Sequence, residues 1–254
     1  MSKREKCGKI RKTEVFYYIT EVDKMYKYET HLHTSPVSRC ARADIEASLA
    51  FYKSLGYDGV FVTNHFIGGN MNVTSDDTYE QRVNMYFDDI EKSKQLGKSM
   101  GIKVFAGAEI GYRGTDFLVY GVGREFYLQN PDFVNIHTTD MLARIREAGG
   151  LVIQAHPFRE ANYINHIRLF PRHVDGVEVC NASRPDEENE MNLLYAEHYG
   201  LLMSAGSDNH TASNVRMLGG MSSPTPIADE DEYISLFRAG ELTIFCEKNP
   251  MRAD

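Results

Sequence analysis

Long apolar runs are missing from this sequence of 254 residues. No stretch approaches the roughly 18 consecutive apolar residues of a transmembrane helix, which excludes a protein of that class. Cysteine is also scarce: Cys7, Cys40, Cys180 and Cys246 are too few for a disulfide framework and too widely spaced for a CxxC metal site. We therefore expect free thiols.

Basic residues are the second shortage. The chain holds 28 Lys and Arg against 36 Asp and Glu, a formal net charge of −8. Six of the basic residues lie in residues 1–12, which predicts a solvated basic tail with no apolar segment of the signal-peptide kind behind it. The rest of the chain is more acidic and should repel a polyanion, which argues against long nucleic acid as a partner. A cytoplasmic protein acting on small molecules is the simplest expectation.

Apolar periodicity alternates between short strand-like runs and helical segments. We expect strands at 25–31, 58–63, 102–108, 116–122, 151–155, 175–180, 201–205 and 242–246, and helices at 42–55, 78–100, 138–148, 183–199 and 229–239. No linker long or polar enough to divide residues 1–254 is present. The alternation predicts one α/β domain with a mostly parallel sheet flanked by helices, either open or closed into a barrel.

Histidine and carboxylate residues fall where these strands end. The set comprises His31, His33, His65, Glu109, His156, Asp208 and His210. His31 and His33 form an HxH pair, and the period of a strand points both rings to one face. Parallel α/β folds build their active sites on this rim. Convergent imidazoles and carboxylates predict a site for Zn²⁺, Mn²⁺ or Fe²⁺, because buried charge needs a partner or a metal ion.

Five motifs in order resemble those of the polymerase and histidinol phosphatase (PHP) superfamily. They are HLH (31–33), TNH (63–65), AE (108–109), AHP (155–157) and GSDNH (206–210), within a resemblance that covers about residues 28–246. The resemblance implies a distorted seven-stranded β/α barrel, two or three divalent metal ions and hydrolysis of phosphoesters. Histidinol phosphate, protein phosphotyrosine and short oligonucleotides are among the substrates it leaves open.

The resemblance also implies roles for individual residues. One metal site matches His31, His33, Glu109 and Asp208; Glu109 would bridge to a second metal that His156 binds, and a third site matches His65 and His210. Glu109, Asp208 and His210 are the expected catalytic residues. The sequence departs from the family pattern at three places: Arg39 or Cys40 stands near an expected ligand, Asn64 replaces an Asp, and Asp116 is the candidate where the family has a further histidine.

The expected chemistry is metal-assisted hydrolysis of a small phosphorylated substrate. A metal pair polarises phosphoryl oxygens and lowers the pKa of a bound water from 15.7 toward about 7, so that metal-bound hydroxide attacks and no Ser or Cys nucleophile is required. Arginines near the rim would bind phosphate oxygens in pairs. Arg159 in HPFR is the first candidate, followed by Arg39 and Arg113.

Two other interpretations stay open. An amidohydrolase-type C–N hydrolase also uses metal hydroxide on a His/Asp rim, although no strand-end lysine stands out here as a bridging ligand. The departures at Arg39, Asn64 and Asp116 would also suit a metal-stabilised interaction module without catalytic activity. Metal analysis and parallel assays on phosphate esters and amides separate these possibilities.

Overall fold

The computed structural model describes residues 24–252. The basic tail expected at 1–12 and Cys7 therefore lie outside the described residues. Cys40, Cys180 and Cys246 carry free thiols. No helix of the described part of the chain is both long enough and apolar enough to cross a membrane.

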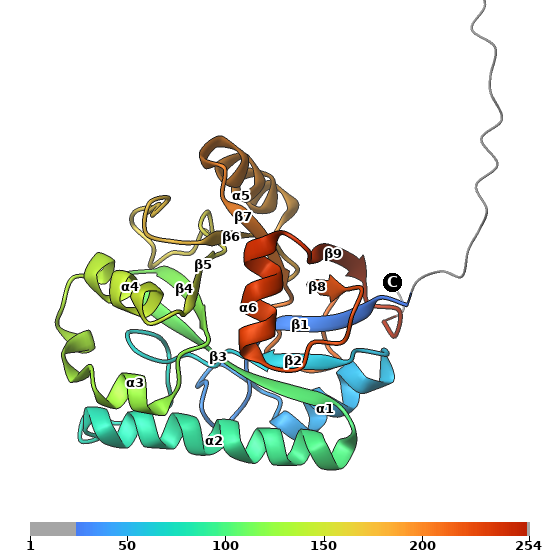
Figure 1. Cartoon of the computed structure of the whole chain (residues 1–254), viewed down its shortest axis with the longest axis horizontal. Coiled ribbons are helices and arrows are strands. Elements are labelled where there is room, and N and C mark those ends of the chain that lie inside the picture. The colour runs from blue at the N-terminus through green and yellow to red at the C-terminus, as the bar shows by residue number, and fades with distance from the viewer. Residues whose placement is uncertain (1–23, 253–254) are drawn as a thin grey trace, which may run out of the picture.

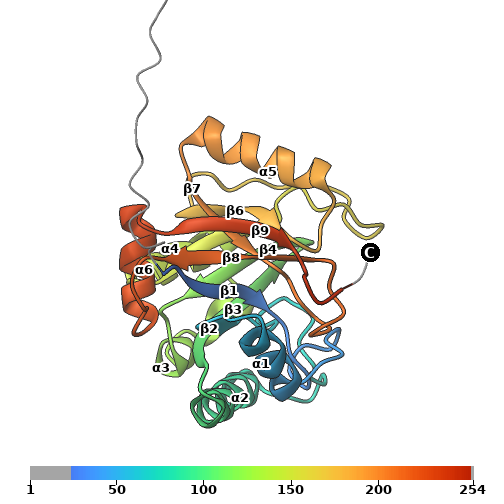
Figure 2. The same cartoon turned by 90° about the vertical axis from the view of Figure 1, so that its right-hand side faces the viewer.

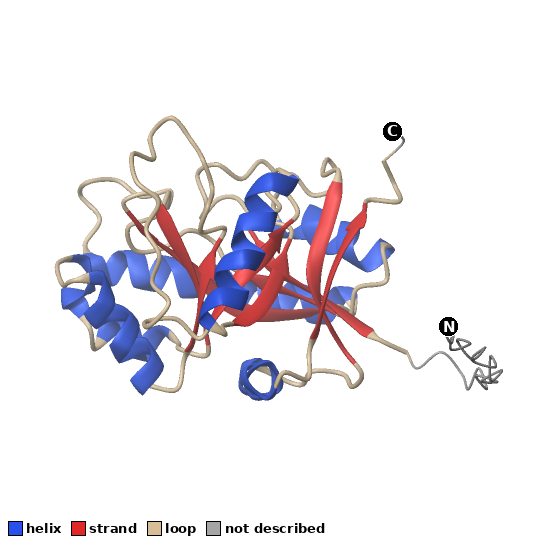
Figure 3. Ribbon diagram, turned by 90° about the horizontal axis from the view of Figure 1, so that it is seen from above, coloured by secondary structure: helices blue, strands red, loops and turns tan. Residues whose placement is uncertain are grey.

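One nine-stranded sheet organises the molecule, with helices on several sides of it (Figures 1 and 3). Its strands are β1 (Tyr26–Leu32), β2 (Gly59–Val62), β3 (Lys103–Tyr112), β4 (Thr115–Tyr120), β5 (Leu151–Ala155), β6 (Gly176–Asn181), β7 (Leu202–Gly206), β8 (Met217–Ser223) and β9 (Thr243–Lys248). The helices are α1 (Ile45–Ser54), α2 (Tyr79–Met100), α3 (Arg124–Leu128), α4 (Thr138–Glu147), α5 (Asp186–Tyr199) and α6 (Glu230–Ala239), with a 3₁₀ turn at Pro131–Val134. The strand order is β7-β6-β5-β4-β3-β2-β1-β8-β9.

The prediction of an α/β barrel-like fold is confirmed, but the strand number and the mostly parallel sheet are wrong. Nine strands form the sheet instead of seven, and antiparallel pairs join β3 to β4, β4 to β5, β1 to β8 and β8 to β9. The chain reverses between β3 and β4 through Arg113 and Gly114, both with positive φ, so β4 returns beside β3 without a crossover helix. Strand β8 was missed because its sequence, MLGGMSS, holds two glycines and no regular alternation.

Strand β7 nearly closes the sheet by lying against β1 and β8. His33 N–H donates to Asn209 C=O at 2.9 Å, and Asn209 N–H donates to His31 C=O at 3.2 Å, just beyond the end of β7. Gly206 of β7 and Gly219 of β8 approach so closely that a Cβ on Gly219 would stand 2.4 Å from the Gly206 carbonyl oxygen. Glycine is therefore required at this seam, because any side chain would push the two backbones apart.

Helix α6 covers the end of the barrel at which β1 begins, and the long loops lie at the opposite end (Figure 2). Its Tyr233 ring packs 4.4 Å from the Phe61 ring and 5.3 Å from the Tyr120 ring, centroid to centroid, inside the barrel. The amino end of the barrel is thus filled by aromatic core. The carboxyl ends of β1, β2, β5, β6 and β7 remain as the place for a site, as expected from the sequence.

The seam between β7 and β8 gives a first prediction. Replacing Gly219 by Ala should destabilise the protein by about 1–3 kcal/mol, the usual cost of overpacking, because rigid backbone faces the new methyl group. Gly123→Ala is the matched control, since Gly123 has an ordinary φ of −107° and nothing within 4 Å of its Cβ position. Urea unfolding of both variants measures the difference, and equal midpoints would show that the seam has room to relax.

Candidate metal centre

Four of the expected ligands converge: His31 of β1, His33 just after β1, Glu109 of β3 and Asp208 in the loop after β7. The Nε2 atoms of His31 and His33 lie 3.1 Å apart. The Glu109 carboxylate lies 3.4 Å from His31 Nε2 and 3.5 Å from His33 Nε2, and Asp208 Oδ1 lies 3.6 and 3.4 Å from the same two atoms. Ligand atoms about 2.0–2.1 Å from a tetrahedral Zn²⁺ are about 3.3 Å from one another, so these spacings suit a common cation.

Two buried atoms in this cluster have no hydrogen-bond partner. Glu109 Oε2 and His65 Nδ1 lie 2.6 Å apart, yet without the alignment of a hydrogen bond, and both remain unsatisfied. The Glu109 side chain is only 1% exposed. A buried carboxylate oxygen without a donor is costly, whereas a bound divalent ion would satisfy it directly. These two buried atoms therefore support a metal ion at this cluster, and this support is independent of the sequence motifs.

Glu178 of β6 orients two of the imidazole-bearing residues. Its Oε1 lies 2.8 Å from His31 Nδ1, and its Oε2 accepts the backbone N–H of His156 at 3.1 Å. Asn181 Nδ2 donates to Oε2 at 2.9 Å. With both oxygens engaged, Glu178 is placed to fix the tautomer of His31, as carboxylates behind metal-ligating histidines do.

Glu29, one strand period before His31, was missed from the sequence. Its Oε1 accepts the backbone N–H groups of His31 at 2.8 Å and Ser207 at 2.9 Å, and its Oε2 accepts the Tyr52 hydroxyl at 2.7 Å. Glu29 is fully buried, and burial raises the pKa of its carboxyl. The alternation of the strand could have identified Glu29, because Glu29, His31 and His33 share one face of it. Only the two histidines were interpreted as metal ligands.

The backbone is strained where two of the expected ligands lie. His156 has a φ of +25° and Asp208 a φ of +50°, a region that costs a residue with a side chain about 1–3 kcal/mol. Surrounding hydrogen bonds hold both positions: Glu178 accepts His156 N–H, and Asn181 Nδ2 donates to Asp208 Oδ2 at 3.3 Å. These two backbone conformations lower the stability of the fold, and they direct the side chains of His156 and Asp208 toward the cluster.

A second donor set joins Glu109, Asp116 and His156, whose nearest ligand atoms all lie within 4.8 Å of one another. Asp116 enters the site because β4 runs antiparallel, which brings the start of β4 to the rim where its neighbours end. Burial, followed by the nearby Glu109, raises the pKa of Asp116 to about 6. The structure therefore places the departure noted at Asp116 beside the ligands expected for a second metal.

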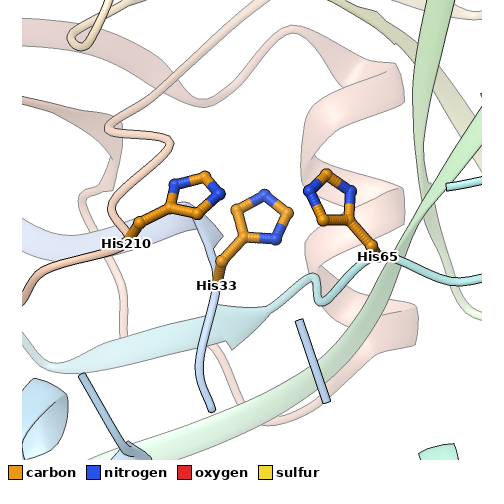
Figure 4. A group of neighbouring side chains, drawn as sticks. All are labelled: His33, His65 and His210. Carbon is orange, nitrogen blue, oxygen red and sulfur yellow. The ribbon is translucent and has the colours of Figure 1, made fainter. Parts of the chain in front are cut away.

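A third donor set joins His33, His65 and His210 (Figure 4). The His33 ring lies in the middle, with centroids 4.4 Å from His65 and 4.2 Å from His210. Cys40 lies beside this set and interacts with the imidazoles of His65 and His210. Burial opposes its ionisation, but His210 and His65 lower the pKa of the Cys40 thiol to about 6. Cys40, and not Arg39, thus lies beside His65 and His210.

The buried carboxylates of Glu109 and Asp208 are stabilised by positive charge beside them. Burial opposes ionisation of Glu109 and Asp208, but His65 holds the pKa of Glu109, and His31 that of Asp208, well below the usual range. Burial likewise opposes protonation of His31, yet Glu178 and Asp208 raise its pKa well above the ordinary value. The imidazoles of the cluster thus stabilise the ionised form of these carboxylates. Metal ions would take over that role, with proton release on binding.

One large pocket lies over the three donor sets, with a volume of about 970 Å³. Arg159 lines it, as expected from the sequence, and its Nη1 lies 3.5 Å from Asp116 Oδ2. Arg39 and Arg113 lie outside the lining: the Arg39 guanidinium donates to Val73 C=O at 2.8 Å, and the exposed Arg113 stacks over Tyr112. Sequence reasoning missed four other lining arginines, namely Arg42, Arg184, Arg216 and Arg252.

Comparison with known proteins shows which solved structures share the fold of this chain. No family model matches the chain. Two uncharacterised proteins of Methanocaldococcus jannaschii match it, one at 30% identity over 95 residues and one at 38% over 84 residues. The matches cover 37% and 30% of this chain and only 52% and 35% of those proteins.

Solved structures match most of the chain. A two-domain protein of Bacteroides vulgatus containing a predicted PHP-like metal-dependent phosphoesterase aligns at a TM-score of 0.62 and 12% identity, over 87% of this chain and 65% of that one. The chain has the PHP-like fold. A lesion-specific endonuclease of Pyrococcus furiosus aligns at 0.53 and 14% identity (87% and 58% covered), and an amidohydrolase of Chromobacterium violaceum at 0.50 and 12% (86% and 97% covered).

Asn64, the remaining departure, has a positioning role in this version of the PHP-like fold. Its Oδ1 accepts Thr34 N–H at 2.6 Å and the Ser38 hydroxyl at 2.8 Å. Ser38 Oγ in turn lies 3.1 Å from His33 Nδ1 and accepts His65 N–H at 3.0 Å. Asn64 therefore positions His33 and His65 through Ser38.

Metal binding can be tested by thermal stability. Saturating Mn²⁺ or Zn²⁺ should raise the unfolding midpoint of chelator-treated protein by about 5–10 °C, because binding at 100 times Kd contributes about 2.7 kcal/mol per site. His33→Ala should lose most of this rise, since His33 belongs to two donor sets. His166→Ala is the control, an exposed histidine outside those sets. An unchanged midpoint with every divalent ion would contradict the assignment.

Proposed function

We propose that this chain is a metal-dependent phosphoesterase that acts on a small phosphorylated substrate. The observation that carries the proposal is the pair of buried atoms Glu109 Oε2 and His65 Nδ1, which have no hydrogen bond and belong to residues that line a pocket together with five arginines. Cation ligands and guanidinium groups that line one pocket suit a phosphate ester. The PHP-like fold, shared with a protein that contains a predicted phosphoesterase of this kind, supports the same conclusion.

The proposed ligands divide into three groups. His31, His33 and Asp208 would hold one ion together with Glu109, which also belongs to a second set with Asp116 and His156, while His65 and His210 would contribute to a third. When bound, the ions would polarise the phosphoryl oxygens and make an attacking water acidic enough to react at neutral pH. Zn²⁺, Mn²⁺ and Fe²⁺ are all compatible with imidazole and carboxylate donors.

Arg159 is the proposed phosphate-binding side chain. It follows His156 in a tight turn in which Arg159 N–H donates to His156 C=O at 2.9 Å, so the guanidinium and a proposed ligand are fixed relative to each other. Asp116 and the Tyr163 hydroxyl hold its guanidinium at the pocket. Glu109, Asp208 and His210 keep the proposed catalytic roles, as groups that touch the reacting phosphate or the ions beside it.

Glu109→Gln tests the proposal directly. Protein loaded with Mn²⁺ or Zn²⁺ should hydrolyse an aryl phosphate ester, and the substitution should lower kcat by about a hundredfold or more, because a preorganised charge at the reacting centre is lost. Glu241→Gln is the matched control, since Glu241 is exposed before β9 and lies outside the pocket. Histidinol phosphate, phosphotyrosine and short oligonucleotides complete the panel. Inactivity of the metal-loaded wild type on the whole panel would refute the proposal.

Amidohydrolase-type C–N hydrolysis is a second candidate, favoured by the match to the Chromobacterium violaceum amidohydrolase. Lysine is absent from the described residues that line the pocket, whereas five arginines line it, which favours phosphate. Amides and lactones assayed in parallel with phosphate esters distinguish the two chemistries. Less than one equivalent of bound metal together with inactivity on both classes would instead support a non-catalytic module.

A further inference from the structure

The pocket is larger than hydrolysis of a simple phosphate ester requires. Its volume of about 970 Å³ is near the upper end of the 300–1,000 Å³ typical of small-molecule sites. Besides the residues of the metal centre, the segment 214–217 and Arg252 line it. We call the part of the pocket lined by Arg42, the segment 214–217 and Arg252 the second region. The part of the substrate that does not react would lie there.

The arginines in the two regions differ in their partners. At the metal centre, Arg184 makes two 2.7 Å hydrogen bonds to the Glu188 carboxylate, and Arg159 is paired with Asp116. In the second region, Arg42 and Arg216 have no ion pair or side-chain hydrogen bond among the described residues. Among the same residues, the Arg252 guanidinium donates only to Asn214 C=O, at 3.4 Å. Among residues 24–252, no carboxylate forms an ion pair with any of these three cationic side chains of the pocket.

The backbone that carries these arginines is fixed. Arg42 N–H donates to His210 C=O at 2.8 Å, which ties it to the rim of the metal centre. Asn249, only 3% exposed, donates to Val215 C=O at 2.9 Å and to Ser213 C=O at 3.3 Å, and its N–H donates to Arg216 C=O at 2.9 Å. The chain end that bears Arg252 is thereby held against the segment that bears Arg216.

Charge in the rest of the pocket does not neutralise this group. The carboxylates among the described lining residues are Glu109, Asp116 and Asp208, and all three belong to the donor sets of the metal centre. Guanidinium groups bind phosphate oxygens in paired hydrogen bonds, and such charge-assisted bonds are about twice as strong as neutral ones. A second phosphate would supply the missing negative charge.

We propose that Arg42, Arg216 and Arg252 form a second anion subsite, which makes substrates with two phosphate groups better than the corresponding monophosphates. This inference rests on the proposed phosphoesterase function, because the other phosphate must reach the metal centre. It names a substrate class: small molecules with one phosphate to be hydrolysed and a second held as a fixed anchor.

A series of alkanediol bisphosphates with three to eight carbon atoms, beside the matching monophosphates, serves as the set of probes. In metal-loaded wild type, kcat/KM for at least one bisphosphate should exceed that of its monophosphate by about tenfold or more, the size of one charged hydrogen bond. Added salt should reduce the preference, because the arginines are exposed.

The double variant Arg42→Gln with Arg216→Gln should bring the bisphosphate value down to that of the monophosphate, which is measured in the same protein to reveal any general loss. Arg172→Gln is the control, an exposed arginine outside the pocket that should keep the full preference. Equal kcat/KM for both ester classes in an active wild type, or a preference that survives the double substitution, would overturn the subsite.

Binding separates failure of the subsite from failure of the function. Alkane bisphosphonates cannot be hydrolysed, and calorimetry of the metal-loaded protein should show affinity that falls about tenfold or more in the double variant. If no ester is hydrolysed but this dependence is found, the subsite stands and the phosphoesterase proposal falls. If bisphosphonates bind wild type and the double variant equally, the subsite falls whatever the activity.

Discussion

Fully buried carboxylates beneath the histidine cluster are the constraint on which the rest of this structure depends. Glu29 and Glu178 lie in the interior of the barrel, where an unsatisfied carboxylate would cost several kcal/mol. Each is satisfied by groups from separate segments: Glu29 by the backbone of β1 and of Ser207 and by Tyr52, and Glu178 by His31, His156 and Asn181. The same bonds that satisfy these acids set the positions of the imidazoles.

The geometry of the site therefore depends on how closely β7 approaches β1 and β8 to close the sheet. The glycines of the β7–β8 seam let β7 approach β1, and this approach brings the loop that bears Asp208 and His210 over His31 and His33. A wider seam would separate the proposed ligands of β1 from those that follow β7. The close packing of Gly206 against Gly219 thus sets the distances between the proposed metal ligands, although neither glycine is itself a ligand.

Much of this arrangement was predictable because it follows from local patterns. The helix expected at 78–100 and the strands that carry the HxH and AHP motifs follow from periodicity and end signals, and the structure makes Thr78 the N-cap of that helix. Strand β8 and the antiparallel direction of β4 were not predictable in this way, since both depend on pairings with distant strands. Arg216 lies on the approach to β8, so no pattern could place it at the pocket. Asp116 could be named from the sequence, but only the direction of β4 shows why it reaches the rim.

The order of the donors along the chain has a consequence for biogenesis. They run from β1 to the loop after β7. Because β1 also pairs with β8, the neighbours of the first strand are complete only when segments more than about 190 residues later in the chain have joined it. Contacts of such long range form late in folding and slow it. A nascent chain on the ribosome can hold no finished centre until β7 and its loop have emerged. A metal ion that needs donors from both β1 and the loop after β7 would therefore be bound only once that loop is available.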